Sequence, residues 1–98
     1  MEKRSPHCSL PVVKALLEAG KVRTTQTARA GAVALGFSFS DMVAVVRTLT
    51  PADFYKSMTT YADDTIWQDV YRPNTPAGDV YLKLTVIDDV VIVSFKEL

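Results

Sequence analysis

The sequence predicts an α+β fold in a single domain of 98 residues, with helices gathered before a sheet. In the first half of the chain, apolar residues recur at helical spacing. From Phe54 onward they alternate at strand spacing, and β-branched and aromatic residues become frequent. Short links between these strands favour antiparallel pairing. We therefore expect N-terminal helices packed on one face of a C-terminal antiparallel sheet.

The first helix is expected to begin just after Ser9, which is placed to cap it. Pro11 falls in the first turn, where a missing N–H group costs little, and Gly20 suits the left-handed residue after the helix end. One face of this helix is apolar and carries Leu10, Val13, Leu16 and Leu17. Residues 22–24 then form a short β-prone stretch.

Two more helices are expected before the sheet. Thr24 or Thr25 can cap an alanine-rich helix that ends near Gly36, and Ser38 or Ser40 can begin the next one. The apolar stripe of this third helix consists of Met42, Val43, Val46 and Leu49. Residues 50–53 combine a cap, a first-turn proline and an acid three residues after the cap. This pattern predicts one further helical turn.

Four strands should then form an antiparallel meander. They are expected over residues 54–61, 66–73, 79–87 and 90–96. Turn residues separate them, and the last two are joined by the two-residue hairpin Asp88-Asp89.

Alternation along the strands assigns their side chains to two faces. The cleanest apolar rows should cover the helices, and they are Val80, Leu82, Leu84 and Val86, and Val91, Val93 and Phe95. The opposite faces of these two strands should carry Tyr81, Lys83, Ile92, Ser94 and Lys96. In the first strand Phe54, Lys56 and Met58 share a face, and in the second Gln68, Val70 and Arg72 do. Both faces of these first two strands are mixed, so alternation leaves open whether Lys56, Gln68 and Arg72 join the face of Tyr81 and Lys83. If they do, four cations, a phenol and an amide meet on one open surface. By the same alternation Tyr55 points away from Lys56.

The formal net charge of zero conceals an uneven distribution. Residues 1–50 hold seven basic and three acidic side chains, and residues 51–98 hold four basic and eight acidic ones, which gives +4 and −4. In the second half, every cation follows an aromatic residue by one or two positions on a strand, whereas most acids lie in turns. This pattern is typical either of the solvent faces of strands or of a basic, aromatic surface.

Several classes of protein and site are disfavoured by the composition. The chain has no run of about 18 apolar residues that could span a membrane, and Pro11 interrupts any signal-peptide core. The single cysteine, Cys8, has only His7 nearby, so neither a disulfide nor a structural zinc site is expected. His7 is assigned to an exposed N-terminal tail. We expect a cytoplasmic protein without a metal or another cofactor.

The remaining chemistry suits an anionic substrate that contains phosphate. Arg72 can bind a phosphate through two parallel hydrogen bonds. Neighbouring lysines lower each other's pKa, which brings it closer to the range of a general base. RNA carries its own nucleophile, the 2′-OH, so an RNase needs only proton transfer, alignment and charge stabilisation. Aromatic candidates for base stacking are Phe54, Tyr55, Trp67 and Tyr71. Core packing is the favoured interpretation for Trp67.

Two long segments resemble a known protein family. The stretches DFYKSMTTYADDTIWQDVYRP (53–73) and DVYLKLTVIDDVVIVSFKEL (79–98) are similar to the MqsR, or motility quorum-sensing regulator, toxins. The opening MEKR…PH and the segment AGKVRTT (19–25) also match, so the resemblance spans nearly the whole chain.

The resemblance implies a RelE-type fold and a bacterial, ribosome-independent endoribonuclease that cleaves mRNA at GCU-like triplets. It places the functional residues of the family on Lys56, Gln68, Tyr81 and Lys96. We add Arg72, Lys83, Tyr55 and Met58 as RNA-contacting residues. The family implies a cognate, zinc-binding MqsA-like antitoxin that silences the toxin and also binds DNA, so DNA would be contacted only through that complex.

Two other functions fit the same residues. The chain can be a non-enzymatic module that binds RNA or a partner through the same face. It can also be a degenerate toxin that serves only as corepressor of its antitoxin.

Overall fold

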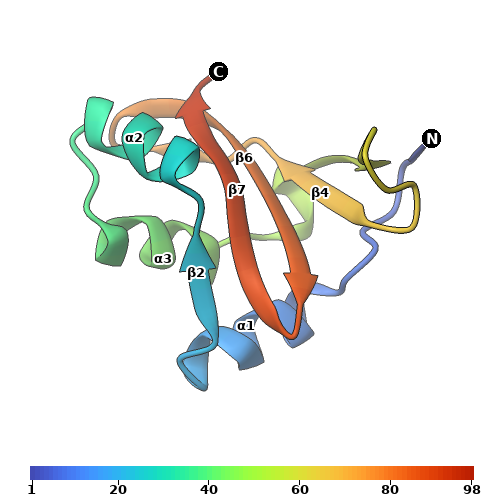
Figure 1. Cartoon of the computed structure of the whole chain (residues 1–98). Helices are drawn as coiled ribbons and strands as arrows, with labels where there is room; N and C mark the ends of the chain where they lie inside the picture. The colour runs from blue at the N-terminus through green and yellow to red at the C-terminus, as the bar shows by residue number, and fades with distance from the viewer.

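The structure is a computed structural model that describes residues 1–98 (Figure 1). It combines three α-helices, a 3₁₀ turn and a seven-stranded sheet, so the predicted α+β class is confirmed. The helices are α1 (Leu10–Glu18), α2 (Gln26–Ala34) and α3 (Phe39–Arg47), and the 3₁₀ turn is η1 (Pro51–Asp53). The strands are β1 (Glu2–Lys3), β2 (Val22–Thr24), β3 (Phe54–Thr59), β4 (Trp67–Tyr71), β5 (Asn74–Thr75), β6 (Gly78–Ile87) and β7 (Asp89–Glu97).

Ser9 lies at the N-cap position of α1, but its side chain makes no capping hydrogen bond, whereas capping side chains mark the starts of α2 and α3. Thr25 caps α2, since its Oγ1 accepts a hydrogen bond from the Ala28 N–H at 3.1 Å. Ser38 caps α3 in a reciprocal arrangement: its Oγ accepts from the Asp41 N–H, while the Asp41 carboxylate accepts from the Ser38 N–H. The alternatives that the sequence leaves open are therefore resolved in favour of Thr25 and Ser38.

The strands form one mixed sheet in the order β1-β3-β4-β6-β7-β2, with β5 added beside β6. The predicted meander is confirmed, because β3, β4, β6 and β7 pair antiparallel in chain order. The expectation of a purely antiparallel sheet is wrong, since residues 22–24 pair parallel with residues 90–92 of β7. Because residues 22–24 and 90–92 are far apart in the chain, no turn joins them, and the sequence carries no hairpin signal for this pairing.

The predicted faces are correct for β6 but only in part for β7. Register shifts between the Lys83–Ser94 pair and the Leu84–Ile92 pair, so Val93 is an extra residue on β7. Beyond this bulge the alternation is inverted. Ile92 is fully buried with the core, and Val91 lies opposite Thr85 on the other face. The assignment of Ile92 to the open face, and of Val91 and Val93 to the helix side, is wrong for this reason.

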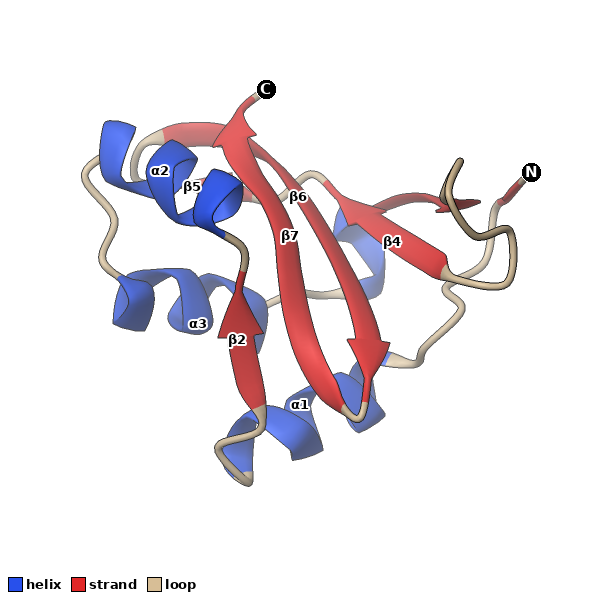
Figure 2. Cartoon of the chain, in the orientation of Figure 1, coloured by secondary structure: helices blue, strands red, loops and turns tan.

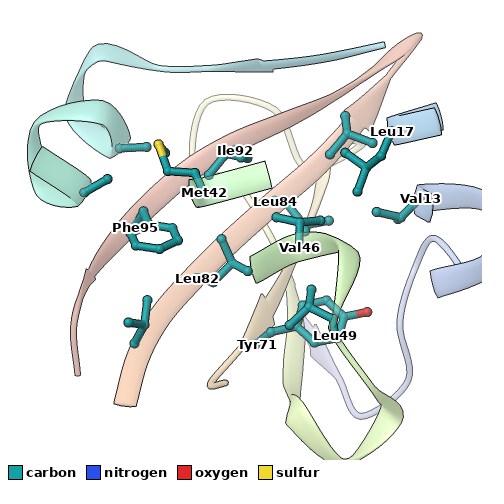
Figure 3. Close-up of a cluster of buried hydrophobic side chains, with 14 residues drawn as sticks. Val13, Leu17, Met42, Val46, Leu49, Tyr71, Leu82, Leu84, Ile92 and Phe95 are labelled. Carbon is teal, nitrogen blue, oxygen red and sulfur yellow. The ribbon is translucent and has the colours of Figure 1, made fainter. Parts of the chain in front are cut away.

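One hydrophobic core joins the helices to the sheet (Figure 3). Its helical members are Val13 and Leu17 of α1, Ala28 and Ala32 of α2, and Met42, Val46 and Leu49 in or just after α3. Its sheet members are Tyr71, Val80, Leu82, Leu84, Val90, Ile92 and Phe95. Most of these side chains have no solvent exposure, so the core holds β6 and β7 in place.

Helix α2 continues along β7 where β2 ends (Figure 2). The Thr25 N–H donates to the Ile92 carbonyl, and the Thr25 hydroxyl donates to the Val93 carbonyl. Gly31 then approaches so closely that a Cβ atom at this position would lie 2.0 Å from the Phe95 carbonyl oxygen and 3.6 Å from the Lys96 Cβ. A glycine at position 31 therefore lets α2 lie directly against the strand that carries Lys96.

No single helix is both long and apolar enough to cross a membrane. Only α2 and α3 taken together meet the length and composition criteria, and they are bent by 93° at their junction.

Candidate functional site

Three lysines meet on the face of the sheet opposite the core residues Leu82 and Leu84. We call this surface the lysine face and define it by Lys56 on β3, Arg72 just after β4, Tyr81 and Lys83 on β6, and Lys96 on β7. Cross-strand pairing sets its geometry. Lys56 lies opposite Val70, which lies opposite Lys83, while Tyr81 lies opposite Lys96. Both Val70 and Leu82 are fully buried, so the strands that carry the cations are tightly packed.

A β-bulge at the start of β3 adds Tyr55 to this face. Phe54 pairs with Tyr71 and Lys56 pairs with Val70, so Tyr55 is the unpaired extra residue. Its ring lies 3.9 Å from the Arg72 guanidinium, 5.4 Å from the Lys56 Nζ and 5.9 Å from the Arg4 guanidinium. The prediction that Tyr55 points away from Lys56 is therefore wrong, because strict alternation does not hold across a bulge.

Tyr81 lies near both Lys83 and Lys96. The Lys96 Nζ is 5.3 Å and the Lys83 Nζ 5.9 Å from the centre of its ring. Gln68 and Met58 face each other in the next cross-strand row, beyond Lys56 and Val70. The structure thus gathers on one surface the eight residues that the sequence analysis assigned to the functional set of the family or to RNA contact: Lys56, Gln68, Tyr81, Lys96, Arg72, Lys83, Tyr55 and Met58.

The N-terminal strand brings a carboxylate to Lys56. Glu2 on β1 accepts a hydrogen bond from the Lys56 Nζ at 2.5 Å. This contact lowers the pKa of Glu2 and raises the pKa of Lys56 above its usual value. The sequence did not reveal the partnership, because the two residues are 54 positions apart and β1 has only two residues.

Lys83 has a different environment. It is half-buried near the middle of the lysine face, and no carboxylate forms an ion pair with it. Burial and the neighbouring charges of Lys96 and Lys56 lower the pKa of Lys83. Although Lys56 and Lys83 lie on the same face, the pKa of Lys56 is raised and the pKa of Lys83 is lowered.

Three aromatic candidates for base stacking lie on the other face of the sheet. Tyr71 is fully buried in the core, and Phe54 meets it edge to face at 5.5 Å. The prediction that Phe54 shares a face with Lys56 is therefore wrong, because the bulge at Tyr55 separates them. Trp67 stacks on His7 with ring centres 5.5 Å apart, and the Lys3 Nζ lies 4.2 Å from its ring. These contacts favour packing roles for Phe54, Trp67 and Tyr71. His7 is exposed, as predicted, and its ring is part of this stack.

The segment before α1 is held by a buried carboxylate that the sequence did not single out. Asp69 is 2% exposed and accepts hydrogen bonds from the His7 N–H at 2.9 Å, the Cys8 N–H at 3.0 Å and the Ser57 hydroxyl at 2.6 Å. It ties the N-terminal segment, and with it Glu2, to the back of β4. Alternation places Asp69 on the helix side, but only the fold shows which groups satisfy it.

No group of three or more His, Cys, Asp or Glu side chains comes together in an arrangement that could hold a metal ion.

Two comparisons with known proteins show the family of this chain. A family described as "Motility quorum-sensing regulator, toxin of MqsA" matches residues 5–97. The chain belongs to this family of toxins. A protein of Escherichia coli (strain K12) named "mRNA interferase toxin MqsR" is 61% identical over 97 residues, and the match covers 99% of each chain. Membership in the MqsR family, inferred from segments that include FYKSMTT and TIWQDVYRP, is thus confirmed, and β3, β4, β6 and β7 lie entirely within the matched range.

Proposed function

We propose that this protein is an mRNA-cleaving endoribonuclease, the toxin of a toxin–antitoxin pair, and that the lysine face is its active site. The observation that carries the proposal is the gathering of Lys56, Lys83, Lys96 and Arg72 around two tyrosine rings on one face of the sheet. Such a surface attracts the phosphates of RNA even though the whole chain has no net charge. The similarity to an mRNA interferase supports the same activity.

The proposed reaction needs no metal ion. An amine takes the proton of the 2′-OH, and the 2′-oxygen attacks the adjacent phosphorus. Arg72 and the lysines stabilise the additional negative charge of the transition state, and this kind of electrostatic stabilisation is often the largest contribution to catalysis. Tyr81 orients the scissile phosphate, while Gln68, Met58 and Tyr55 position the flanking nucleotides. The products would be a 2′,3′-cyclic phosphate and a 5′-OH.

The family suggests further features of this proposal. We infer cleavage at GCU-like triplets without the ribosome, in the cytoplasm, and silencing by a cognate zinc-binding antitoxin. We also infer a RelE-type fold in which the helices form a layer opposite the lysine face. The shared core of α1, α2 and α3 with Leu82, Leu84 and Phe95 supports this layer.

The test is digestion of an RNA that contains a single GCU, in EDTA, followed by mapping of both new ends. We expect one cut at the triplet and a cyclic phosphate on the upstream fragment. A requirement for added metal would refute the metal-free mechanism. Salt-sensitive binding of intact RNA, without cleavage over long incubation, would instead identify a non-enzymatic module. Absence of growth arrest on induced expression in bacteria would favour a degenerate corepressor.

Single substitutions test whether the lysine face is the active site. Lys56→Ala and Tyr81→Ala should each abolish cleavage while the far-UV circular dichroism spectrum stays native. Lys21→Ala is a matched control, since this exposed lysine lies in the loop between α1 and β2 and has no ion pair. Full activity of both lysine-face variants would place the active site elsewhere.

A further inference from the structure

We propose that the Lys83 amine is the general base that takes the proton of the 2′-OH. This inference rests on the proposed function and assigns one role within it. The resemblance to the family points instead to Lys56 and Lys96 as its functional lysines.

Lys83 occupies the middle of the site. Strand β6 is an interior strand, with β4 on one side and β7 on the other. Across the sheet, Lys83 pairs with Val70, whose other partner is Lys56. On its own strand, the Lys83 Nζ lies 5.9 Å from the Tyr81 ring. An RNA that crosses the lysine face from Lys56 on β3 to Lys96 on β7 would therefore pass over Lys83.

The charged and titratable groups that face Lys83 come from three strands. They are Lys56 from β3, Lys96 from β7 and Tyr81 from β6 itself, while β4 faces Lys83 with Val70 and is followed by Arg72 on the same face. None of them is a carboxylate. Burial, Lys96 and Lys56 all lower the pKa of Lys83 and so favour the neutral amine that a base requires.

Lys56 is less suited to the same role. The Glu2 carboxylate accepts a hydrogen bond from its Nζ at 2.5 Å and raises its pKa, so Lys56 is held as an ammonium ion. An ammonium ion can stabilise phosphate charge, but it cannot accept a proton. Glu2 is thus a positioning residue that acts through Lys56.

The step is balanced without a redox partner. The neutral Lys83 amine takes the 2′-OH proton, the bond between the 2′-oxygen and phosphorus forms, and the bond between phosphorus and the 5′-oxygen breaks. The leaving 5′-oxygen takes a proton from the Lys96 ammonium. Proton exchange with water then restores both side chains, and no water is consumed.

Arginine substitutions separate the two lysines, because arginine keeps the positive charge but does not deprotonate in proteins. For Lys83→Arg we expect single-turnover cleavage to slow by about 10²-fold or more, with little change in RNA affinity. The increase of the wild-type rate with pH should disappear. Lys56→Arg should lose some rate but keep this increase. Lys21→Arg is the matched control.

Cleavage by Lys83→Arg within threefold of wild type, with the same pH profile, would overturn the assignment. If Lys83→Arg does not fold, Lys83→Ala decides the question: added ethylamine should restore cleavage by Lys83→Ala and not by Lys56→Ala. Restoration in Lys56→Ala alone, or in neither variant, would also overturn it. Failure of the wild-type protein to cut RNA at all would count against the proposed function itself, which these variants do not test.

Discussion

Replacing Gly31 with alanine should destabilise this protein, although helix propensity alone predicts the opposite. Gly31 lies within α2, where alanine is intrinsically favoured over glycine by about 1 kcal/mol. The new Cβ atom, however, would lie 2.0 Å from the Phe95 carbonyl oxygen, where carbon atoms do not approach closer than 3.0 Å. The obstacle is backbone, so it cannot rotate away, and α2 must retreat by about 1 Å from β7.

The retreat affects buried contacts that define the core. Ala28 and Ala32 of α2 have no solvent exposure, and a gap of this size forfeits about a quarter to a half of the dispersion energy of each affected contact. Overpacking typically costs about 1–3 kcal/mol, and a rigid clash with backbone belongs at the upper end. After the propensity gain of about 1 kcal/mol, we expect a net loss of about 2 kcal/mol.

The assay is thermal unfolding followed by circular dichroism. For a domain of this size, a loss of about 2 kcal/mol lowers Tm by about 10 °C. The control is Ala30→Gly at the adjacent, exposed position of α2, which should lose only the propensity difference of about 1 kcal/mol. A Tm for Gly31→Ala equal to or above that of the wild type would refute the close approach of α2 to β7.

Three further predictions concern buried groups. Asp69→Ala removes the acceptor of three hydrogen bonds and should cost about 3 kcal/mol or more in urea unfolding; an unchanged midpoint would contradict the proposed anchoring of the N-terminal segment. The buried Tyr71 hydroxyl has no hydrogen-bond partner, so Tyr71→Phe should leave stability unchanged or raise it by about 1 kcal/mol at neutral pH. Burial also raises the pKa of Tyr71, so above about pH 10 the tyrosine ionises in the unfolded chain before it does in the folded protein, and the wild type should lose stability. The unfolding free energy of Tyr71→Phe should lack this pH-dependent loss. Burial and the Asp69 charge raise the pKa of the Cys8 thiol, so iodoacetamide should alkylate the native protein more slowly than the unfolded chain at about pH 8, and equal rates would contradict the burial of Cys8.

Local patterns in the sequence were sufficient for the helices and the meander. Pro11 in the first turn, the caps of α2 and α3 and the hairpin between β6 and β7 involve residues within a few positions of one another, so local patterns predict them. The sequence leaves two candidates for each cap, and the predicted two-residue turn Asp88-Asp89 is one residue too long, since Asp89 already pairs with Ile87. The parallel pairing of β2 with β7 joins residues 22–24 to residues 90–92. Contacts over such distances leave no periodic signal.

In the candidate site, too, local patterns could be predicted from the sequence, whereas features that depend on strand register could not. Period-two alternation predicts that Lys83 and Tyr81 share a face, and register then places Lys96 and Lys56 beside them. Alternation fails at bulges, which bring Tyr55 onto the lysine face and turn Ile92 into the core. A bulge inserts one residue and inverts every assignment beyond it, and the sequence carries no marker of its position.

The sequence by itself determined the fold class, the strands that carry the cations and the family to which the chain belongs. Only the tertiary structure decided how the lysines differ. Glu2 reaches Lys56 because β1 pairs with β3 at the sheet edge, and Lys83 is half-buried between two other lysines because β6 is an interior strand. Residue type specifies that a group can titrate, whereas its proton affinity depends on the charges and the solvent that surround it in space.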